Sequence, residues 1–500
     1  MKNIFLILIL ISYYNFIFCQ DIQKNIFLDR DFWKSKPSVE LVKAKINEGN
    51  NPVEQDDFGF DAVSYGIIDN TPIEIIKYLL SIDGNPVTKK THGNITYLLW
   101  AGYKGNIQLI KYLIELGSDI EFTTERGTNI LLMSGFGGQQ DTLLYDYFLS
   151  KGVNINSCNS SKMNILLALA GSDANDENTF NYLINKGLEW HYKDDENNGF
   201  FHYSARAGNI ENMKLALKKN IDYNLYNSKG ENAMFFASYG RRRSEIILNT
   251  LTFLDSLGLK VNIVNNRGET PLHHAVKRGN AKVIEFFLDH GIDVNKVDEN
   301  GNTAFVNSIF GKLENIQILL PLINDINHKN KDGHSALSKS VIYAKKDIFN
   351  FLIENGANLN VEAENKDDLI SLAFKNHSER KEEDYKYIID TLVNMGVIVK
   401  SNYSEGNTLL HYAVEKNNLF LVKKAIELNV DPNYKNQIGL TSLHLAAMKA
   451  TNSDITEVLI EAGADKKILT DFGESSYDLA SENEILISNN VDITHLQLKD

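Results

Sequence analysis

Residues 265–275 read Asn-Asn-Arg-Gly-Glu-Thr-Pro-Leu-His-His-Ala, and residues 279–295 read Gly-Asn-Ala-Lys-Val-Ile-Glu-Phe-Phe-Leu-Asp-His-Gly-Ile-Asp-Val-Asn. Gly268 can take the positive φ of a tight turn. Thr270 can cap a helix that begins with Pro271, because proline is tolerated in the first helical turn. In the second run, apolar residues recur at i, i+3 and i+4, which predicts an amphipathic helix. The stretch therefore predicts a turn followed by two helices.

Close copies of this stretch recur along the chain. Residues 439–447 read Gly-Leu-Thr-Ser-Leu-His-Leu-Ala-Ala, and residues 406–413 read Gly-Asn-Thr-Leu-Leu-His-Tyr-Ala. Aligned on the turn, the copies place these residues in one slot: Gly59, Asn94, Gly127, Lys162, Asn197, Gly230, Gly268, Gly301, Gly333, Lys366, Gly406, Gly439 and Gly473. Successive slots lie 32 to 40 residues apart. The chain is therefore built from internal repeats.

This pattern resembles the ankyrin repeat, whose period is about 33 residues. The resemblance covers about 425 residues and implies an all-α fold: an α-solenoid of about 13 repeats, each a helix-turn-helix unit with a short β-hairpin finger. No single unit can bury its apolar face alone, so the units must stack. We expect an N-terminal cap over residues 20–55, the solenoid over residues 56–481, and a C-terminal cap or tail over residues 482–500.

Some positions depart from the pattern. Lys162 and Lys366 fit the turn slot poorly, because a side chain disfavours the left-handed conformation. The two longest intervals hold their extra residues around Arg241–Glu245 and Asn376–Asp384. We expect both insertions at the turn between the two helices of a unit. The polar run from His377 to Asp384 favours an exposed loop.

The first 19 residues are typical of a signal peptide. Lys2 supplies the positive start, and Ile4 to Ile11 are apolar without interruption. The stretch is too short and mixed for a membrane-spanning helix. Cleavage before Gln20 resembles bacterial export signals. The alternative, a lipid anchor on Cys19, needs Gly or Ala before the cysteine, where Phe18 stands, so we expect no anchor and no membrane span.

Composition limits the possible partners. The formal net charge of −14 argues against general affinity for nucleic acid, which needs a concentrated basic surface. The dense basic run Arg241–Arg243 is interpreted as a solvated turn. The chain has two cysteines, Cys19 and Cys158, and cleavage would remove the first. We therefore expect a monomer without an internal disulfide, held together by packing.

No motif indicates chemistry. Twelve histidines suggest a metal site, but neither HExxH nor paired CxxC occurs. The run from Asp293 to Gly301 lacks the ligands of a calcium loop. We expect His202, His273, His411 and His444 to bond backbone groups of neighbouring turns. GxSxG and phosphate-binding glycine loops are absent from the sequence. We predict no catalytic residues, no metal and no cofactor.

The resemblance predicts where a partner would bind. Ankyrin stacks form a groove from finger tips and the exposed side of the first helices. In this sequence the corresponding positions are Asn266, Arg267, Glu269, Lys277, Arg278, Glu299, Asn300, Asn302, Phe310, Tyr239 and Tyr343. Exposed aromatic and Arg side chains are frequent anchors of interfaces. We expect Arg267, Arg278, Phe310, Tyr239 and Tyr343 to form a central patch.

Three classes of function follow. The first is a non-enzymatic scaffold that binds a partner protein in the periplasm or outside the cell. The second is a secreted effector directed at a host cell, distinguished by whether the protein leaves the cell. The third is an enzyme with an unfamiliar site, which a hydrolase screen would detect. The first is our prediction, and the identity of the partner is beyond the sequence.

Overall fold

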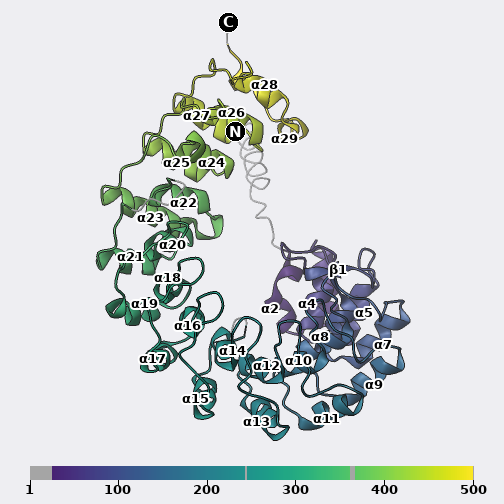
Figure 1. Ribbon diagram of the computed structural model, residues 1–500. Coiled ribbons are helices and arrows are strands. Elements are labelled where there is room, and N and C mark those ends of the chain that lie inside the picture. Colours follow the sequence, from purple (N-terminus) through teal and green to yellow (C-terminus); the bar gives the residue numbers. More distant parts are fainter. Residues whose placement is uncertain (1–24, 242–244, 361–365, 499–500) are drawn as a thin grey trace, which may run out of the picture. The chain divides into compact units, whose positions relative to one another are not determined.

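The computed structural model describes residues 25–241, 245–360 and 366–498 (Figure 1). The predicted signal peptide, residues 1–19, and Cys19 lie outside the described residues. The chain divides into two compact units. Unit 1 contains the residues up to Ala237 together with Asn249–Leu259, and unit 2 contains Ser238–Leu248 and the residues from Lys260 onward.

Unit 1 begins with the helices η1 (Ile26–Leu28), α2 (Arg30–Lys34) and α3 (Val39–Asn47). Trp33 is fully buried, and its indole Nε1–H donates to the carbonyl oxygen of Phe27 at 2.8 Å. Helix pairs follow: α4 (Ala62–Ile68) and α5 (Ile73–Leu80), α6 (Tyr97–Lys104) and α7 (Ile107–Glu115), α8 (Ile130–Phe136) and α9 (Thr142–Ser150), α10 (Ile165–Ala170) and α11 (Glu177–Asn185), α12 (Phe200–Ala207) and α13 (Ile210–Lys218), α14 (Ala233–Tyr239) and α15 (Leu248–Ser256). The boundary between the units passes through α14 and the start of α15.

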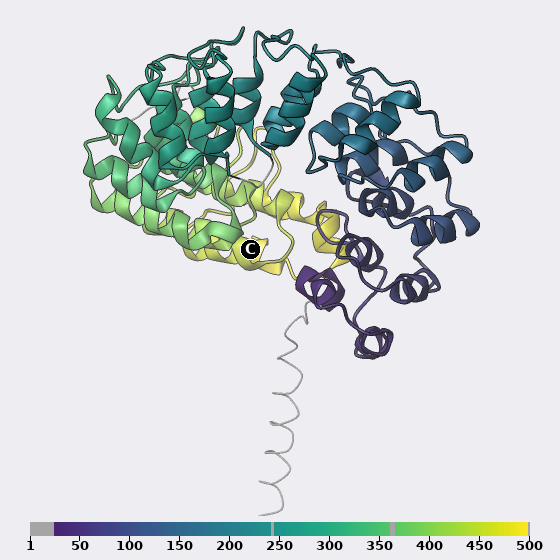
Figure 2. The ribbon, with the colours of Figure 1, turned by 90° about the horizontal axis from the view of Figure 1, so that it is seen from below.

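Unit 2 continues the same alternation. Its pairs are α16 (Pro271–Arg278) and α17 (Ala281–Asp289), α18 (Ala304–Asn307, extended by η3, Ser308–Phe310) and α19 (Leu313–Leu319, extended by η4, Leu320–Leu322), α20 (Ala336–Ile342) and α21 (Lys346–Glu354), α22 (Leu369–Asn376) and α23 (Glu382–Asn394), α24 (Leu409–Glu415) and α25 (Leu419–Glu427), α26 (Ser442–Lys449) and α27 (Asp454–Glu461), α28 (Ser476–Ser481) and α29 (Glu484–Ser488). The last helical turn is η7 (Thr494–Leu496). First helices contact first helices and second helices contact second helices (Figures 1 and 2). The predicted all-α solenoid is confirmed.

The turn slot has one conformation throughout. Every aligned turn residue has positive φ, from 60° at Asn94 and Lys162 to 82° at Gly473. Lys366, at 66°, adopts it as well. The two lysines that fit the slot poorly by residue type therefore still occupy it.

The fingers are closed by backbone bonds, such as that from the Asn265 amide to the Glu269 carbonyl oxygen at 2.9 Å, and by side chains. Among the described residues, β1 (Lys90–Thr91) and β2 (Ile95–Thr96), which flank η2 (His92–Asn94), form the one two-stranded sheet, and its strands are antiparallel. In other fingers an Asn or Asp three residues before the slot accepts two backbone N–H bonds. Asn265 Oδ1, for example, accepts from Arg267 and Glu269, each at 3.0 Å. Such local bonds fix a turn without a strand ladder.

Successive fingers are also joined through the backbone. The amide of Glu299 donates to the carbonyl oxygen of Arg267 at 2.7 Å, and that of Lys331 to Asn300 at 2.9 Å. We call this line of bonds the finger row. It ties the fingers of Gly268, Gly301 and Gly333 to one another, and the Gln437 amide donates to the Glu405 carbonyl oxygen at 3.0 Å in the same way, without using the side chains at the tips.

The predicted role of the repeat histidines is confirmed. His273 Nδ1 lies 3.0 Å from the backbone nitrogen of Thr270, and Nε2 lies 3.2 Å from the carbonyl oxygen of Asn302 in the next repeat. His202, His411 and His444 make the corresponding pair of contacts. The imidazole thus joins the start of its own helix to the following repeat.

The second insertion differs from its prediction. Residues after Asn376 form η5 (Glu379–Lys381) and the start of α23, and His377 is 8% exposed. Glu382, Glu383 and Asp384 lie in the first turn of α23, where acidic side chains stabilise a helix. The expected exposure is confirmed for residues 378–381 and 383, but the expected loop is wrong, because residues 379–384 are helical. The insertion lies where the sequence predicts, between the two helices of the unit.

Candidate protein-binding surface

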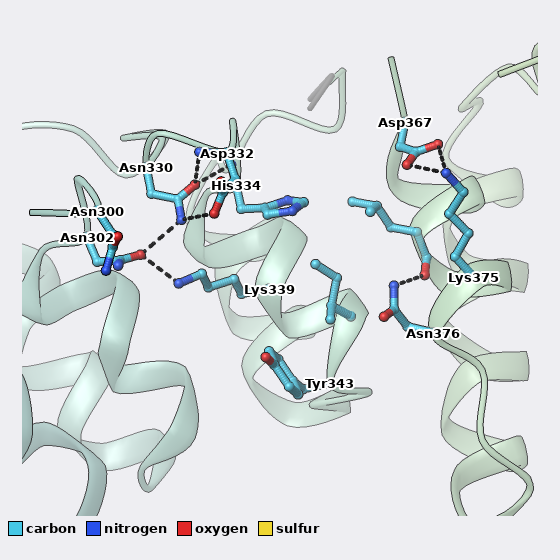
Figure 3. A pocket seen from close by; sticks show the side chains of 12 residues that line it. Asn300, Asn302, Asn330, Asp332, His334, Lys339, Tyr343, Asp367, Lys375 and Asn376 are labelled. Atoms are coloured by element: carbon cyan, nitrogen blue, oxygen red, sulfur yellow. Dashed lines mark hydrogen bonds and ion pairs between the residues drawn. The ribbon is translucent and has the colours of Figure 1, made fainter. Parts of the chain in front are cut away.

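A polar pocket of about 510 Å³ lies on unit 2, where three successive repeats meet (Figure 3). Fingers contribute Asn300, Asn302, Asn330 and Asp332. The helices contribute Lys339 from α20, and Lys375 and Asn376 from α22, while Tyr343 directly follows α20. The fingers and first helices of unit 2 lie on the inner side of its curve in Figure 1, and we call this side the inner face.

Asn302 organises one side of the pocket. Its Oδ1 accepts from Asn330 Nδ2 at 3.1 Å and from Lys339 Nζ at 2.7 Å, while its Nδ2 donates to Asp298 Oδ2 at 3.1 Å (Figure 3). The residue is only 8% exposed. Asn302 was expected at the exposed groove surface. It is buried instead, because its amide joins two fingers and α20.

An ion pair forms the opposite side. Lys375 Nζ lies 2.7 Å and 2.9 Å from the two carboxylate oxygens of Asp367, whose side chain is fully buried. The same Nζ donates to Ser404 Oγ at 3.0 Å and lies 4.5 Å from the ring centroid of Tyr412. Burial lowers the pKa of Lys375, but the bonds to Asp367 and Tyr412 outweigh it, so the pKa is raised. This lysine is a fixed part of the wall.

Two exposed rings lie beside the pocket. Phe310, 37% exposed, ends η3, and Tyr343, 44% exposed, follows α20. Their ring centroids are 4.7 Å apart at 68°, an edge-to-face contact. Residues predicted separately from their slots thus form one aromatic pair on neighbouring repeats.

The predicted finger-tip residues are exposed. Asn266, Arg267, Glu299 and Asn300 all lie at the surface. Arg267 Nε is 3.8 Å from Glu299 Oε1, and both side chains are about half exposed, so the pair contributes little stability. The guanidinium remains accessible to a partner.

Other predicted residues bond within the protein. Glu269 Oε1 lies 3.3 Å from His274 Nε2, and its Oε2 accepts from Asn265 at 2.8 Å. Burial opposes ionisation of Glu269, but these bonds outweigh it and lower its pKa to about 2. Arg278 donates to the carbonyl oxygens of Tyr239 and Arg241 at 3.3 Å and 3.0 Å, and the Tyr239 ring packs against His274. Within the expected central patch, Arg267, Phe310 and Tyr343 are therefore accessible, whereas Arg278 and Tyr239 make contacts within the protein.

Sequence reasoning missed apolar finger tips. Ile438 is 66% exposed and Phe472 is 89% exposed, each directly before a turn glycine, Gly439 and Gly473. Phe58, 59% exposed, precedes Gly59 in the same way. Arg267 was selected because it directly precedes a turn residue, and the same criterion selects all three of these residues. They provide further apolar contact points outside the predicted set.

The described part of the chain holds neither a metal-ligand cluster nor a membrane-spanning helix. Across residues 25–241, 245–360 and 366–498, no three His, Cys, Asp or Glu side chains gather as metal ligands would. Over the same ranges, no helix combines the length and apolar character needed to cross a membrane.

Helix pairs joined by rigid fingers, with side chains presented along one face, define a repeat solenoid of the kind that binds other macromolecules. Residues 244–330 and 380–470 match the family model for ankyrin repeats (3 copies). The chain carries ankyrin repeats, which are protein-interaction modules.

Relatives share the repeats at low identity. The chain is 24% identical over 284 residues to ankyrin repeat protein L371 of Acanthamoeba polyphaga mimivirus, a match covering 50% of this chain and 36% of that protein. It is 23% identical over 354 residues to the E3 ubiquitin-protein ligase KEG of Arabidopsis thaliana, covering 60% and 21%. It is 28% identical over 210 residues to ankyrin repeat protein FPV018 of Fowlpox virus, covering 40% and 27%. The chain thus spans less than two fifths of the length of these relatives.

Proposed function

We propose that the chain is a non-enzymatic scaffold that holds a partner protein on the inner face of unit 2. The exposed Phe310–Tyr343 pair beside the polar pocket carries this proposal. Aromatic side chains that leave water on binding are among the strongest contributors to interfaces. The contact between the two rings already restricts their side-chain conformations in the free protein, so little conformational entropy is lost on binding.

The test is capture of partners by the tagged full-length protein under mild crosslinking, followed by mass spectrometry. We expect one stoichiometric partner that is lost from the double variant Phe310→Ala/Tyr343→Ala. The control is Leu143→Ala, which removes a more exposed apolar side chain, 68% exposed, from α9 in unit 1. A partner retained by the double variant, or lost equally from the control, would contradict the proposal.

We also propose that the protein acts in the periplasm or outside the cell. Lys2 and the apolar run Ile4–Ile11 support export. Cell fractionation and sequencing of the mature N-terminus test this, with Gln20 as the expected first residue. Recovery of the protein from host cells would instead favour the alternative, a secreted effector directed at a host. A cytoplasmic protein that keeps its N-terminus would contradict export.

Binding without catalysis is part of the same proposal. Lys375 is held by the Asp367 carboxylate, and Lys339 has one bond, to the neutral Asn302 amide. A hydrolase screen of the purified protein should give no turnover. Activity that copurifies through a second, unrelated purification would contradict this part.

A further inference from the structure

Two lysines of the inner face have no carboxylate partner within hydrogen-bonding distance among the described residues. Lys339 Nζ donates to the neutral amide oxygen of Asn302. Lys277, on α16, makes no side-chain hydrogen bond or ion pair in the described part of the chain. Lys375 on the same face differs, because two oxygens of Asp367 accept from it. The inner face therefore holds both paired and unpaired ammonium groups.

Both unpaired lysines are partly removed from water. Burial lowers the pKa of Lys339 and of Lys277. Asp298 opposes this effect at both sites, and Lys277 in turn lowers the pKa of Lys339, so the two ammonium groups lie near enough to repel each other. Charges in such places interact more strongly with an added anion than fully exposed charges do.

Asp298 cannot serve as a close partner for either lysine without losing other bonds. Its Oδ1 accepts from the backbone amides of Asn300 and Asn302 at 2.9 Å and 2.8 Å. Its Oδ2 accepts from Asn302 Nδ2 at 3.1 Å. The carboxylate closes its own finger, which leaves the ammonium groups to be neutralised from outside.

The surroundings of Lys339 suit a peptide. Tyr343 lies one helical turn further along, so its side chain and that of Lys339 share a face. The Phe310 ring packs on Tyr343, and Ile342 and Leu372 line the same pocket as Lys339 and Lys375. A cationic group, apolar side chains and two exposed rings thus follow one another within about 510 Å³ of open space and its edge.

We propose that the segment of the partner bound here is an acidic peptide: an Asp or Glu carboxylate accepts from Lys339 beside Lys277, and a neighbouring apolar side chain packs on Phe310 and Tyr343. The inference rests on the proposed function and specifies its partner. A carboxylate fits better than a phosphate because the carboxylates of Asp298 and Asp332 lie at the site. Their charges repel a doubly charged group more strongly than a singly charged one.

The experiment selects peptides from a random display library on the full-length protein. The best peptide is then synthesised with a fluorophore, and its binding is measured by anisotropy. We expect selected peptides to carry Asp or Glu next to an aromatic or aliphatic residue. Lys339→Glu should weaken binding by about tenfold or more, because the attraction between Lys339 and the peptide carboxylate is replaced by repulsion. Lys339→Met should weaken binding by less, because it removes the attraction without adding repulsion. The matched control is Lys282→Glu on the exposed side of α17, which should bind as the native protein does.

A charge exchange sharpens the test. The selected peptide with its acidic residue changed to Lys should bind Lys339→Glu more tightly than it binds the native protein. Thermal unfolding of every variant, followed by circular dichroism, establishes that each is folded. Lys339→Met provides the measurement if Lys339→Glu does not fold.

The outcomes separate the two proposals. The acidic-peptide proposal is contradicted if the selected peptides need Phe310 and Tyr343 but lack acidic residues, or if they bind the Lys339→Glu variant as tightly as the native protein. The scaffold proposal is unaffected by either result. Displacement of the peptide by inorganic phosphate, with tighter binding of a phosphorylated version, assigns Lys339 to phosphate and also overturns it. If no selected peptide depends on Phe310 and Tyr343 for binding, the result contradicts both the acidic-peptide proposal and the scaffold proposal.

Discussion

Four buried histidines show how one side chain serves both its own repeat and the next. In His202, His273, His411 and His444, Nδ1 faces the backbone N–H at the start of the helix, so the proton is carried by Nε2, which donates to a carbonyl oxygen further along. Burial lowers the pKa of each. The arrangement requires the neutral ring, because a second proton on Nδ1 would face an N–H donor.

This requirement predicts a loss of stability in acid. Burial lowers the pKa of His202 from 6.5 to about 4. Between these values the unfolded chain binds the proton and the folded protein does not, so stability is full above pH 6.5 and falls as the pH drops toward 4. The loss from this residue is about 3 kcal/mol at most. Urea unfolding midpoints over this range should fall less for His202→Gln than for the native protein. His191→Gln, which changes an exposed histidine, should follow the native curve.

The buried pair of Lys375 and Asp367 predicts a second effect at the same scale. Lys375→Met leaves the Asp367 carboxylate buried without its cation and should destabilise the protein by about 3 kcal/mol. Lys375→Met/Asp367→Leu should recover much of that loss, because both charges are then absent. Equal stability of the single and the double variant in chemical denaturation would show that the ion pair is not the cause.

At the scale of the element, the turn slot and the helix pair follow from local signals. Gly268, the Thr270-Pro271 start and the apolar spacing each act within a few residues, so the sequence alone is enough to predict them. The burial of Asn302 depends on Asn330 and Lys339, about thirty residues away in the next repeat, which no local pattern reports. Phe310 and Tyr343 were expected in one patch, but their direct contact was not, because the turn slots predict positions within a repeat and not distances between side chains of different repeats.

The turn slot also gives a prediction of its own. Lys162 has φ of 60°, a conformation that costs a residue with a side chain about 1 kcal/mol. Lys162→Gly should therefore raise the free energy of unfolding by about that amount, after a partial offset from the freer unfolded chain. Lys151→Gly makes the same chemical change at φ of −94° and should lower stability. Similar effects of the two changes on thermal unfolding would contradict the role given to φ.

At the scale of the whole molecule, stability comes from stacked apolar faces. The buried apolar side chains extend from Phe27 to Leu496. Cys158 is a free thiol, and Cys19 lies outside the described residues. The net charge of −14 favours solubility, while the local cations Lys339 and Lys277 provide for recognition. The net charge of the protein is therefore negative, whereas the side chains proposed to bind the partner are positively charged.

Packing without disulfides predicts indifference to reductants. Thermal unfolding of the purified protein should have the same midpoint with and without a thiol reductant, because Cys158 forms no bridge within the described residues. Cys158→Ser serves as the control and should behave like the native protein under both conditions. A midpoint lowered by the reductant in the native protein alone would reveal a bridge through Cys158.

The finger row separates what the surface presents from what holds it in place. Backbone bonds join Arg267 to Glu299 and Asn300 to Lys331, while the side chains at these tips make no contribution to the row itself. Tip residues can therefore be exchanged one at a time over evolutionary time without loosening the frame that carries them. Ile438 and Phe472 are apolar, whereas other finger tips carry charged side chains. The tip positions therefore accept side chains of very different polarity. A molecule built this way can acquire a new specificity by small steps, each of which leaves a folded protein.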